Sequence, residues 1–500
     1  MGIVNRLKQQ FEHPHIVNPA KALHVARPPS PIKSQADTSI DARTIYRNRF
    51  NNGVNLGSLF VLEPWIFDSK LNEFGGNCEL EHINNICQKT SPNDAIQRLQ
   101  NHYTEYINRI DWKWLSDVAH VTALRVPVGY WHVNNGFFTD GLPFQPLKQI
   151  YEQSKPWDML KSLIEKANQY NIGILVDIHG LPGGANTDSH SGETSGNACF
   201  FSTSKYVNTM IENVIPFIVS DLSLRYENII GIQVVNEAKF DEKAKDEQKY
   251  YEKAIRTINQ IDPGLPIVIS DGWWPQQWAD WLEKKKFDTL VVIDSHVYRC
   301  FSDEDKSQSA EQIINNLSQS VNFPANKADF VVGEFSCVLD EQTWSKTNGD
   351  RQEWAKKFGN EQINVFRNVA SWGWFFWTLQ FQWGDGGEWG FVPQVNNGAI
   401  PVRNKSSISI DPVRIQEIIS EHVKYWNGKG DRFEHERFEA GIKQAAEDIQ
   451  NFDHFDHSRI GRIRSWMITR RAQHIQQYGD SEFIWEWEQG YQRGISEFNQ

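Results

Sequence analysis

Residues 229–237 read IIGIQVVNE, an apolar run that ends in an asparagine and a glutamate. A short, nearly continuous apolar run is typical of a parallel strand that is covered on both faces. Similar runs recur along the chain, and stretches with a helical period separate most of them. The other runs are residues 53–62, 121–128, 172–179, 265–271, 289–296, 330–335 and 372–380.

Eight strands that alternate with helices are typical of a (β/α)8 TIM barrel, although a doubly wound sheet has the same alternation. A barrel also places its chemically active residues at the carboxyl ends of the strands. The runs have this property, since polar or aromatic residues occur in them at or near their ends. These residues are Arg125, His179, Asn236, Glu237, Asp271, His296, Tyr298, Glu334 and Trp377. We therefore predict an α/β protein built on a (β/α)8 barrel.

The sequence on either side of this alternating region has a different composition. Residues 1–50 are polar and contain several prolines, which predicts a poorly structured N-terminal arm. We assign residues 51–425 to the barrel, with a last helix over residues 408–425. Residues 426–500 are charged and helical in pattern, and they form either an independent helical hairpin or a layer packed on the barrel. We favour the second arrangement, a helical extension packed on the barrel.

Composition excludes several classes of partner. The chain has 500 residues, with 51 basic and 63 acidic side chains, so its net charge of −12 argues against a nucleic-acid-binding protein. No stretch of about 18 uncharged apolar residues occurs, so we expect no membrane span. The N-terminus lacks the apolar core of a secretory signal, and the five cysteines form no disulfide framework. We therefore expect a cytoplasmic protein with reduced thiols.

The same inspection finds no cofactor or metal motif. The histidines lack ligand spacings such as HExxH, and the glycine-containing segment HGLPGGAN at residues 179–186 lacks the Lys-Ser/Thr of a phosphate-binding loop. We predict no cofactor and no metal site. Protein partners cannot be inferred from the sequence.

Two glutamates are the best candidates for chemistry. Glu237 and Glu334 both follow apolar strands of the predicted barrel. Two carboxylates at one barrel mouth are suited to general acid/base catalysis combined with nucleophilic attack at an anomeric carbon. That chemistry requires one carboxyl group to be protonated and the other to be ionised. The alternative is that each glutamate forms a surface salt bridge.

The neighbouring residues favour the catalytic interpretation. Arg125 is suited to keep Glu334 ionised, and Tyr298 to donate a hydrogen bond to it. Asn236 is suited to hold a sugar hydroxyl, while His179 and His296 are suited to bind hydroxyls or to orient the acid. Polar groups of this kind are costly inside a core unless they are paired, but they are ordinary in the mouth of an active site.

Tryptophan is the other unusual feature, with 20 residues in the chain. Sugar rings have apolar faces that stack on aromatic side chains. We expect most of the tryptophans to be packing residues and a few to contact ligand, with Trp377 the strongest candidate. Trp65, Trp131, Trp273, Trp274 and Trp383 also follow predicted strands.

Several segments together resemble glycoside hydrolase family 5, and in particular its fungal exo-β-1,3-glucanase branch. The likeness extends over residues 50–400 or so, and its motifs are VNLGSLFVLEPW, RVPVGYW, DIHGLPGGAN, VVNEA, DSHVYRCF, GEFS and WFFWTLQ. The resemblance implies a retaining β-glycosidase in which Glu237 is the acid/base and Glu334 the nucleophile. It also implies that Glu63 grips the non-reducing glucose and that Phe301 is half of an aromatic gate. The remaining implied substrate-binding residues are Arg125, His179, Asn236, His296, Tyr298 and Trp377.

The chain also departs from that branch. The secreted enzymes have Phe-Asp-Asn where this chain has Asp188, Ser189 and His190, so the second gate aromatic is missing. Their signal peptide and disulfide pattern are absent, and the C-terminal segment has no counterpart in them. The chain is similar instead to intracellular yeast and fungal relatives.

We therefore expect an exo-acting β-glucosidase or glucan β-glucosidase that hydrolyses terminal β-glucose from a small glucoside or β-glucan oligosaccharide. Two alternatives remain open at this point. One is a non-catalytic carbohydrate-binding or scaffold protein on the same barrel. The other is a transglycosylase, which uses the same intermediate with a sugar acceptor in place of water.

Overall fold

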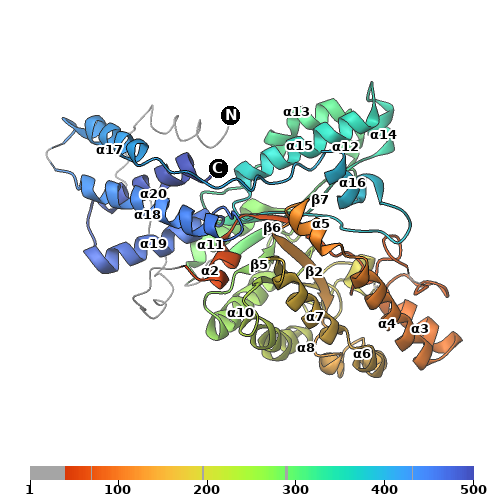
Figure 1. The fold of residues 1–500 in the computed structure, drawn as a ribbon. Helices are drawn as coiled ribbons and strands as arrows, with labels where there is room; N and C mark the ends of the chain where they lie inside the picture. Colours follow the sequence, from red (N-terminus) through yellow and green to blue (C-terminus); the bar gives the residue numbers. More distant parts are fainter. Residues whose placement is uncertain (1–39, 69, 194–195, 288–290, 431) are drawn as a thin grey trace. The chain divides into compact units, whose positions relative to one another are not determined.

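The computed structural model describes residues 40–68, 70–193, 196–287, 291–430 and 432–500 (Figure 1). The predicted N-terminal arm lies, over residues 1–39, outside the described residues. The chain divides into two compact units. The described part of the barrel unit comprises residues 51–68, 70–193, 196–284 and 291–403. The C-terminal unit contains residues 40–50 and most residues from 404 to 500, together with 285–287.

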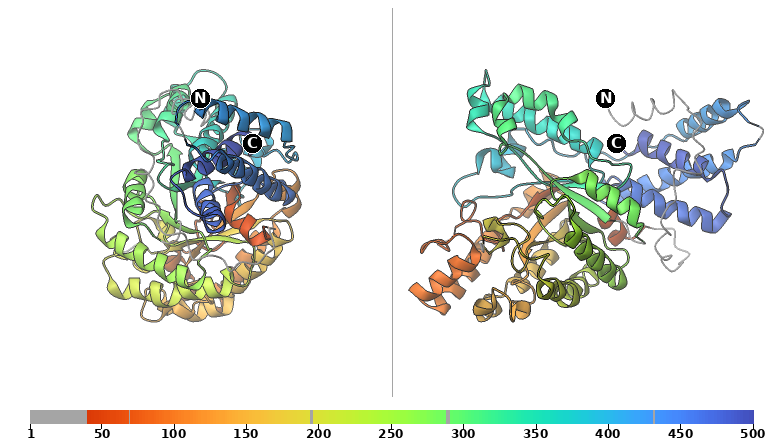
Figure 2. Two further views of the ribbon diagram at one scale, coloured as in Figure 1. Left: turned by 90° about the vertical axis from the view of Figure 1, so that its left-hand side faces the viewer. Right: turned by 180° about the vertical axis from the view of Figure 1, so that it is seen from behind.

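The barrel unit confirms the predicted (β/α)8 fold. Within the described residues, eight parallel strands pair in sequence order, and β1 pairs with β8 to close the barrel. The helices that follow the strands lie on its outside (Figures 1 and 2). The strands are β1 (Asn51–Asn55), β2 (Ala123–Gly129), β3 (Gly173–Gly180), β4 (Ile229–Gln233), β5 (Ile267–Ser270), β6 (Val291–Arg299), β7 (Asp329–Leu339) and β8 (Gly373–Phe376).

Each predicted apolar run overlaps one of these strands, because a strand covered by helices on the outside and packed side chains on the inside buries both faces. Every residue of β3 is buried, for example. The helices of the barrel unit are α3 (Glu79–Lys89), α4 (Pro92–Asn108), α5 (Trp112–Asp117), α6 (Lys148–Ser154), α7 (Pro156–Asn168), α8 (Ser204–Thr209), α9 (Ile215–Ile218), α10 (Lys245–Ile261), α11 (Pro275–Lys285), α12 (Asp303–Ser307), α13 (Ala310–Ser320), α14 (Glu341–Ser345), α15 (Arg351–Val369) and α16 (Phe391–Asn396).

The first strand is shorter than its apolar run. The prediction placed a strand over residues 53–62, but β1 ends at Asn55. The chain then turns at Gly57 and Ser58, and Ser58 has a left-handed backbone with φ of 62°. Residues 56–62 are nevertheless all buried. Their apolar character therefore reflects burial of the loop after β1 rather than continuation of the strand.

The C-terminal unit consists of α2 (Ala42–Asn48), α17 (Pro412–Trp426), α18 (His435–His454), α19 (Ile463–Tyr478) and α20 (Ile484–Phe498). Its helices pack closely because glycines replace side chains where α18 meets α20. A Cβ atom added to Gly490 would lie 2.1 Å from the carbonyl oxygen of Phe438. One added to Gly441 would lie 2.2 Å from that of Trp487.

Two predicted boundaries of this unit need correction. Helix α17 belongs with the C-terminal helices rather than with the barrel, since Ile418 and Ile419 share a buried cluster with Phe438 and Ile442 of α18. Residues 42–48 are not part of a loose arm. They form α2, whose Ile45 is buried in a core with residues of α18, α19 and α20. The packing of this extension on the barrel stays a prediction.

Two further expectations concern cysteines and membrane association. No disulfide bond joins any of the five cysteines, all of which lie within the described residues. Among the helices of the described residues, none is both long enough and apolar enough to cross a bilayer.

Candidate active site

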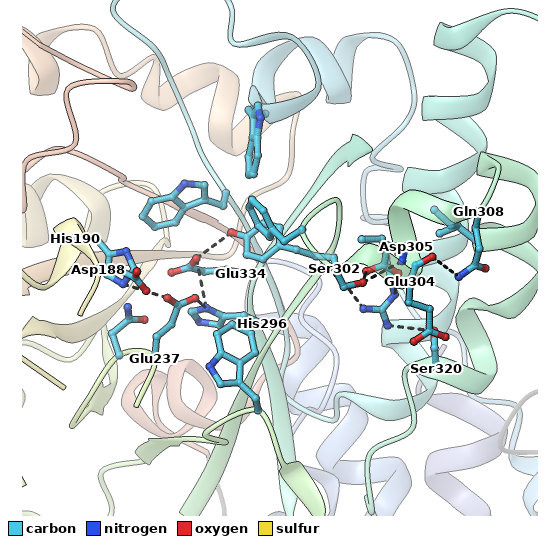
Figure 3. A pocket seen from close by; sticks show the side chains of 18 of the residues that line it. Asp188, His190, Glu237, His296, Ser302, Glu304, Asp305, Gln308, Ser320 and Glu334 are labelled. Atoms are coloured by element: carbon cyan, nitrogen blue, oxygen red, sulfur yellow. Dashed lines mark hydrogen bonds and ion pairs between the residues drawn. The ribbon is translucent and has the colours of Figure 1, made fainter. Parts of the chain in front are cut away.

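A cavity of about 1160 Å³ is lined mainly by residues at the carboxyl ends of the barrel strands and in the loops that follow them (Figure 3). All of the predicted site residues line it except Arg125, which donates hydrogen bonds to two of them, Asn236 and Glu334. The residues that line it are Glu63, His179, Asn236, Glu237, His296, Tyr298, Phe301, Glu334 and Trp377. The cavity therefore brings together side chains that lie as much as 314 positions apart (377 − 63). The strand-end rule predicts seven of these nine residues, and the family resemblance implies the other two, Glu63 and Phe301.

Glu334, on β7, receives hydrogen bonds on both carboxylate oxygens. Arg125 Nη1 donates to Oε1 over 2.9 Å, and the Tyr298 hydroxyl donates to Oε2 over 2.9 Å. Arg125 is fully buried, and although burial disfavours its charge, the carboxylates of Asp177 and Glu334 raise its pKa. Both predicted contacts of Glu334 are thus confirmed, and its carboxylate faces a permanent positive charge.

Two aspartates beneath the cavity were not predicted. Asp177 Oδ2 lies 2.7 Å from His179 Nδ1, and Asp294 Oδ2 lies 3.0 Å from His296 Nε2. Asp177 Oδ2 also lies 3.1 Å from Arg125 Nη2. The sequence carries a usable signal for these pairs. In both strands an aspartate precedes the histidine by two positions, and strand residues two apart share a face.

Asn236 is held in place by residues of two other strands. Arg125 Nη2 donates to its Oδ1 over 2.7 Å, so the amide oxygen is engaged and Nδ2 is left to donate. That nitrogen lies 3.3 Å from His179 Nε2, whose other ring nitrogen is taken by Asp177. The amide orientation is therefore fixed from both ends, as a hydroxyl-binding group requires.

Glu237, which follows β4, lies between two histidines (Figure 3). His296 Nδ1 is 2.7 Å from Oε1, and His190 Nε2 is 3.1 Å from Oε2. Burial alone would raise the pKa of Glu237, but the hydrogen bonds from His190 and His296 hold it well below its usual value. The backbone of Glu237 is left-handed, with φ of 41°, a conformation that is found mostly where function requires it.

His296 links the two glutamates. Its Nδ1 lies 3.4 Å from Glu334 Oε2 as well as 2.7 Å from Glu237 Oε1. One oxygen of each glutamate and a nitrogen of His296 all lie within 4.8 Å of one another. Burial opposes the charge of His296, but the carboxylates of Glu334 and Asp294 raise its pKa well above the usual value. The ring nitrogens of His296 therefore face three carboxyl groups, those of Glu237, Glu334 and Asp294.

The aromatic side chains divide as expected between core and cavity. Trp377 is buried and lies nearly parallel to the His179 ring, with the ring centroids 6.1 Å apart. Trp131 is a core residue, stacked on Phe144 with a centroid separation of 4.0 Å. Trp65 and Trp273 line the cavity, whereas Trp274 and Trp383 are exposed and are not among its lining residues.

Phe301 has an aromatic neighbour that the sequence analysis did not name. The sequence predicts no second gate aromatic in the loop after β3. Trp389, in the loop after β8, lies beside Phe301 in its place. The ring centroids are 6.3 Å apart, and Trp389 also contacts Tyr298 and Trp65. A row of aromatic rings therefore runs along the cavity from Trp65 through Trp389 to Phe301. The sequence signal that could have identified Trp389 is its position in a glycine-rich loop after the last strand.

Glu63 lies in the loop after β1. The indole Nε1 of Trp65 donates a hydrogen bond of 2.9 Å to Glu63 Oε2. Burial raises the pKa of this carboxyl group. Asp271, another strand-end residue, accepts a hydrogen bond of 2.7 Å from Ser295 and is not among the residues that line the cavity.

Metal ligation is chemically conceivable at Glu237, His296 and Glu334, because these side chains are of types that bind metals. The ligand atoms of all three are, however, occupied by the hydrogen bonds described above. The structure gives no feature that requires a cation there, and the expectation of no metal site stays a prediction.

Comparison with known families gives two matches. Residues 85–382 match the model of cellulase (glycosyl hydrolase family 5). Residues 411–500 match the model of the glucan 1,3-beta-glucosidase 3 C-terminal domain. The second match begins close to α17, in agreement with the assignment of that helix to the C-terminal unit.

Two yeast proteins are similar over most of the chain. An uncharacterized glycosyl hydrolase of Saccharomyces cerevisiae is 52% identical over 99% of this chain and 100% of its own length. Glucan 1,3-beta-glucosidase 3 of Schizosaccharomyces pombe is 32% identical over 85% of this chain and 90% of its own length. Among solved structures, a rutinosidase from Aspergillus niger has the same fold. It is 20% identical, with a TM-score of 0.52, over 72% of this chain and 99% of that one.

Proposed function

This chain belongs to glycosyl hydrolase family 5, and we propose that it is a retaining, exo-acting β-glucosidase. It is an O-glycosyl hydrolase similar to glucan 1,3-β-glucosidases. In this proposal it removes terminal β-linked glucose from small glucosides or β-glucan oligosaccharides by double displacement. Glu334 is the nucleophile and Glu237 the acid/base.

The observation that carries the proposal is the separation of the two carboxylates. An oxygen of Glu237 lies within 4.8 Å of an oxygen of Glu334. Retaining glycosidases place their carboxyl groups about 5–5.5 Å apart, and inverting ones about 6.5–9.5 Å apart to leave room for water. The separation supports direct attack by one carboxylate on the anomeric carbon.

In the first step, a Glu334 oxygen attacks the anomeric carbon while the bond to the leaving-group oxygen breaks. Glu237 supplies the proton that the leaving oxygen takes. Arg125 and Tyr298 position Glu334 through the two hydrogen bonds on its oxygens. The product is a glucose ester of Glu334 and a free alcohol or sugar.

In the second step, Glu237 acts as a base and takes a proton from water. The water oxygen bonds to the anomeric carbon, and the ester bond to Glu334 breaks. Two inversions at one carbon retain the β configuration. A sugar hydroxyl in place of water would give transglycosylation through the same intermediate.

Exo action is supported by the residues around the catalytic pair. Glu63 is a buried carboxyl group in the same cavity, held by Trp65. Trp377 and His179 form a wall against which a sugar ring can stack, and the fixed amide of Asn236 offers a hydroxyl partner. These groups would recognise one terminal glucose unit, while the aromatic row ending at Phe301 would contact the rest of the substrate.

We further propose that the protein acts in the cytoplasm. The sequence supports this, because its five cysteines are odd in number and widely spaced and so give no disulfide framework. A cytoplasmic enzyme meets small glucosides or oligosaccharides rather than insoluble cell-wall glucan.

The test is hydrolysis of a panel of β-glucosides that share the glucose and differ in the aglycone, namely an aryl, an alkyl and a β-1,3-oligosaccharide substrate. We expect release of glucose one unit at a time, with kcat/KM varying with the aglycone. Release of larger fragments from the oligosaccharide would contradict exo action. Binding without turnover of any substrate would favour the non-catalytic carbohydrate-binding alternative, and transfer to an added sugar would favour the transglycosylase.

A further inference from the structure

His190 stands beside the acid/base in a position that the proposed mechanism does not use. It lies in a single helical turn, Ser189–Ser191, within the loop after β3. Its Nε2 is 3.1 Å from Glu237 Oε2, and its side chain is about four-fifths buried, with 20% exposed.

We propose that His190 is a positioning residue that stores the proton which Glu237 delivers to the leaving group. This inference rests on the proposed function and assigns the source of the acid proton. Glu237 has a histidine on each oxygen. His296 is less suited to be the store, because its Nδ1 also lies 3.4 Å from Glu334 Oε2, and a deprotonated Nδ1 would face that acceptor oxygen.

His190 Nε2 has a hydrogen-bond partner both when it carries a proton and when it does not. When protonated, Nε2 donates to Glu237 Oε2. When deprotonated, it can accept from Asn186 Nδ2, which lies 3.2 Å away. The Asn186 amide cannot turn over, because Nδ2 also donates to the Glu237 carbonyl over 2.9 Å and Oδ1 accepts from the Asp188 amide over 2.9 Å. A donor is thus ready to stabilise the ring after the proton has left.

The charges that face His190 favour storage of a proton in the free enzyme. Glu237 after β4 is the nearest, and Glu63 after β1 and Glu334 on β7 act from further away. Asp188 of the same loop also lies within 4.8 Å, and His179 of β3 contacts the ring edge-on. Burial opposes the charge of His190, but the bond to Glu237 and the neighbouring carboxylates raise its pKa to about 9.

The proton is conserved through the cycle. In glycosylation, Glu237 takes the proton from Nε2 and gives it to the glycosidic oxygen, which receives the electron pair of the breaking C–O bond. The bond between Glu334 and the anomeric carbon forms, and the deprotonated Nε2 of His190 accepts a hydrogen bond from Asn186 Nδ2. In the second step, water bonds to the anomeric carbon, its proton passes through Glu237 back to Nε2, and Glu334 is released.

The test compares His190→Asn with the wild type on two glucosides over pH 5–10. An alkyl leaving group needs the proton, and a dinitrophenyl leaving group does not. For the alkyl glucoside we expect the wild-type alkaline limb of kcat/KM near pH 9, where His190 loses its proton. His190→Asn leaves the proton to Glu237 alone, whose ordinary pKa is about 4.3, so the limb should move about two pH units or more toward acid. At pH 8 the loss should be about 10-fold or more, with little change for the dinitrophenyl glucoside.

Controls separate a proton store from a structural role. Ser189→Ala changes an exposed side chain of the same turn and should behave as wild type. Equal losses on both substrates, or an unchanged alkaline limb in His190→Asn, would overturn the inference. If His190→Asn fails to fold, His190→Gln takes its place in the comparison. The wild-type profile alone also tests the inference, since a wild-type alkaline limb near pH 5–6 would overturn it. A wild type that hydrolyses neither glucoside would instead contradict the proposed function.

Discussion

Glu334→Gln should lower kcat/KM for an aryl β-glucoside by about four orders of magnitude or more. The amide keeps the size of the side chain. Its oxygen can still accept the hydrogen bond from Arg125, while its nitrogen would donate to the Tyr298 hydroxyl instead of accepting from it. It cannot form the ester intermediate, because an amide is a far weaker nucleophile than a carboxylate. Initial rates of the purified variant and wild type, measured at substrate concentrations well below KM, give the ratio directly.

A matched control distinguishes loss of the nucleophile from a general effect of the substitution. Glu311→Gln makes the same chemical change at an exposed position of α13 and should leave kcat/KM unchanged. Both proteins should have the same melting temperature as the wild type within a few degrees. Hydrolysis by Glu334→Gln at the wild-type rate would remove Glu334 from the mechanism.

Glu237→Ala should affect substrates according to their leaving groups. For an alkyl glucoside, loss of the acid should lower kcat/KM by about 10²- to 10⁴-fold. For a dinitrophenyl glucoside, which departs without a proton, kcat/KM should fall by less than about tenfold, because kcat/KM reports the first irreversible step. With the base also lost, the ester should accumulate, so kcat and KM should fall together for this substrate.

Azide provides the complementary measurement on the same variant. A small anion that needs no base should attack the accumulated ester, raise kcat for the dinitrophenyl glucoside and yield glucosyl azide. Glu242→Ala, at an exposed position of the loop after the same strand, is the control and should not respond to azide. Equal loss on both leaving groups, with no azide effect, would show that Glu237 is not the acid/base.

The barrel could be predicted because its strands leave a strong local signal. Runs such as GILVDIHG in β3 are buried on both faces, so nearly every position is apolar, and the polar exceptions mark the strand ends. The loop after β1 was less predictable. Residues 56–62 are apolar because they are buried, and burial does not distinguish a strand from a covered loop.

The C-terminal unit was predicted less well, since its limits depend on contacts between distant segments. The sequence predicts α17 as the last helix of the barrel region, and its cluster with Phe438 and Ile442 assigns it to the later helices. Helix α2 has seven residues, and Ile45 is its main link to that core, so its stability comes from packing that the local sequence does not show.

In the active site, the sequence identified the residues and some of their contacts. The bonds from Arg125 and Tyr298 to Glu334 are as expected. The sequence did not reveal that His190 contacts Glu237, because the loop after β3 has no periodicity from which to place a side chain. It also missed Trp389, since the aromatic neighbour of Phe301 comes from the loop after β8 rather than from the loop after β3.

The central claim, double displacement by Glu334 and Glu237, is tested most directly by the stereochemistry of the first product. Proton NMR can follow the anomeric signal of glucose during rapid hydrolysis of a β-glucoside, before mutarotation mixes the anomers. The account predicts that β-glucose appears first and α-glucose only later. Initial formation of α-glucose would mean a single displacement by water and would contradict the account.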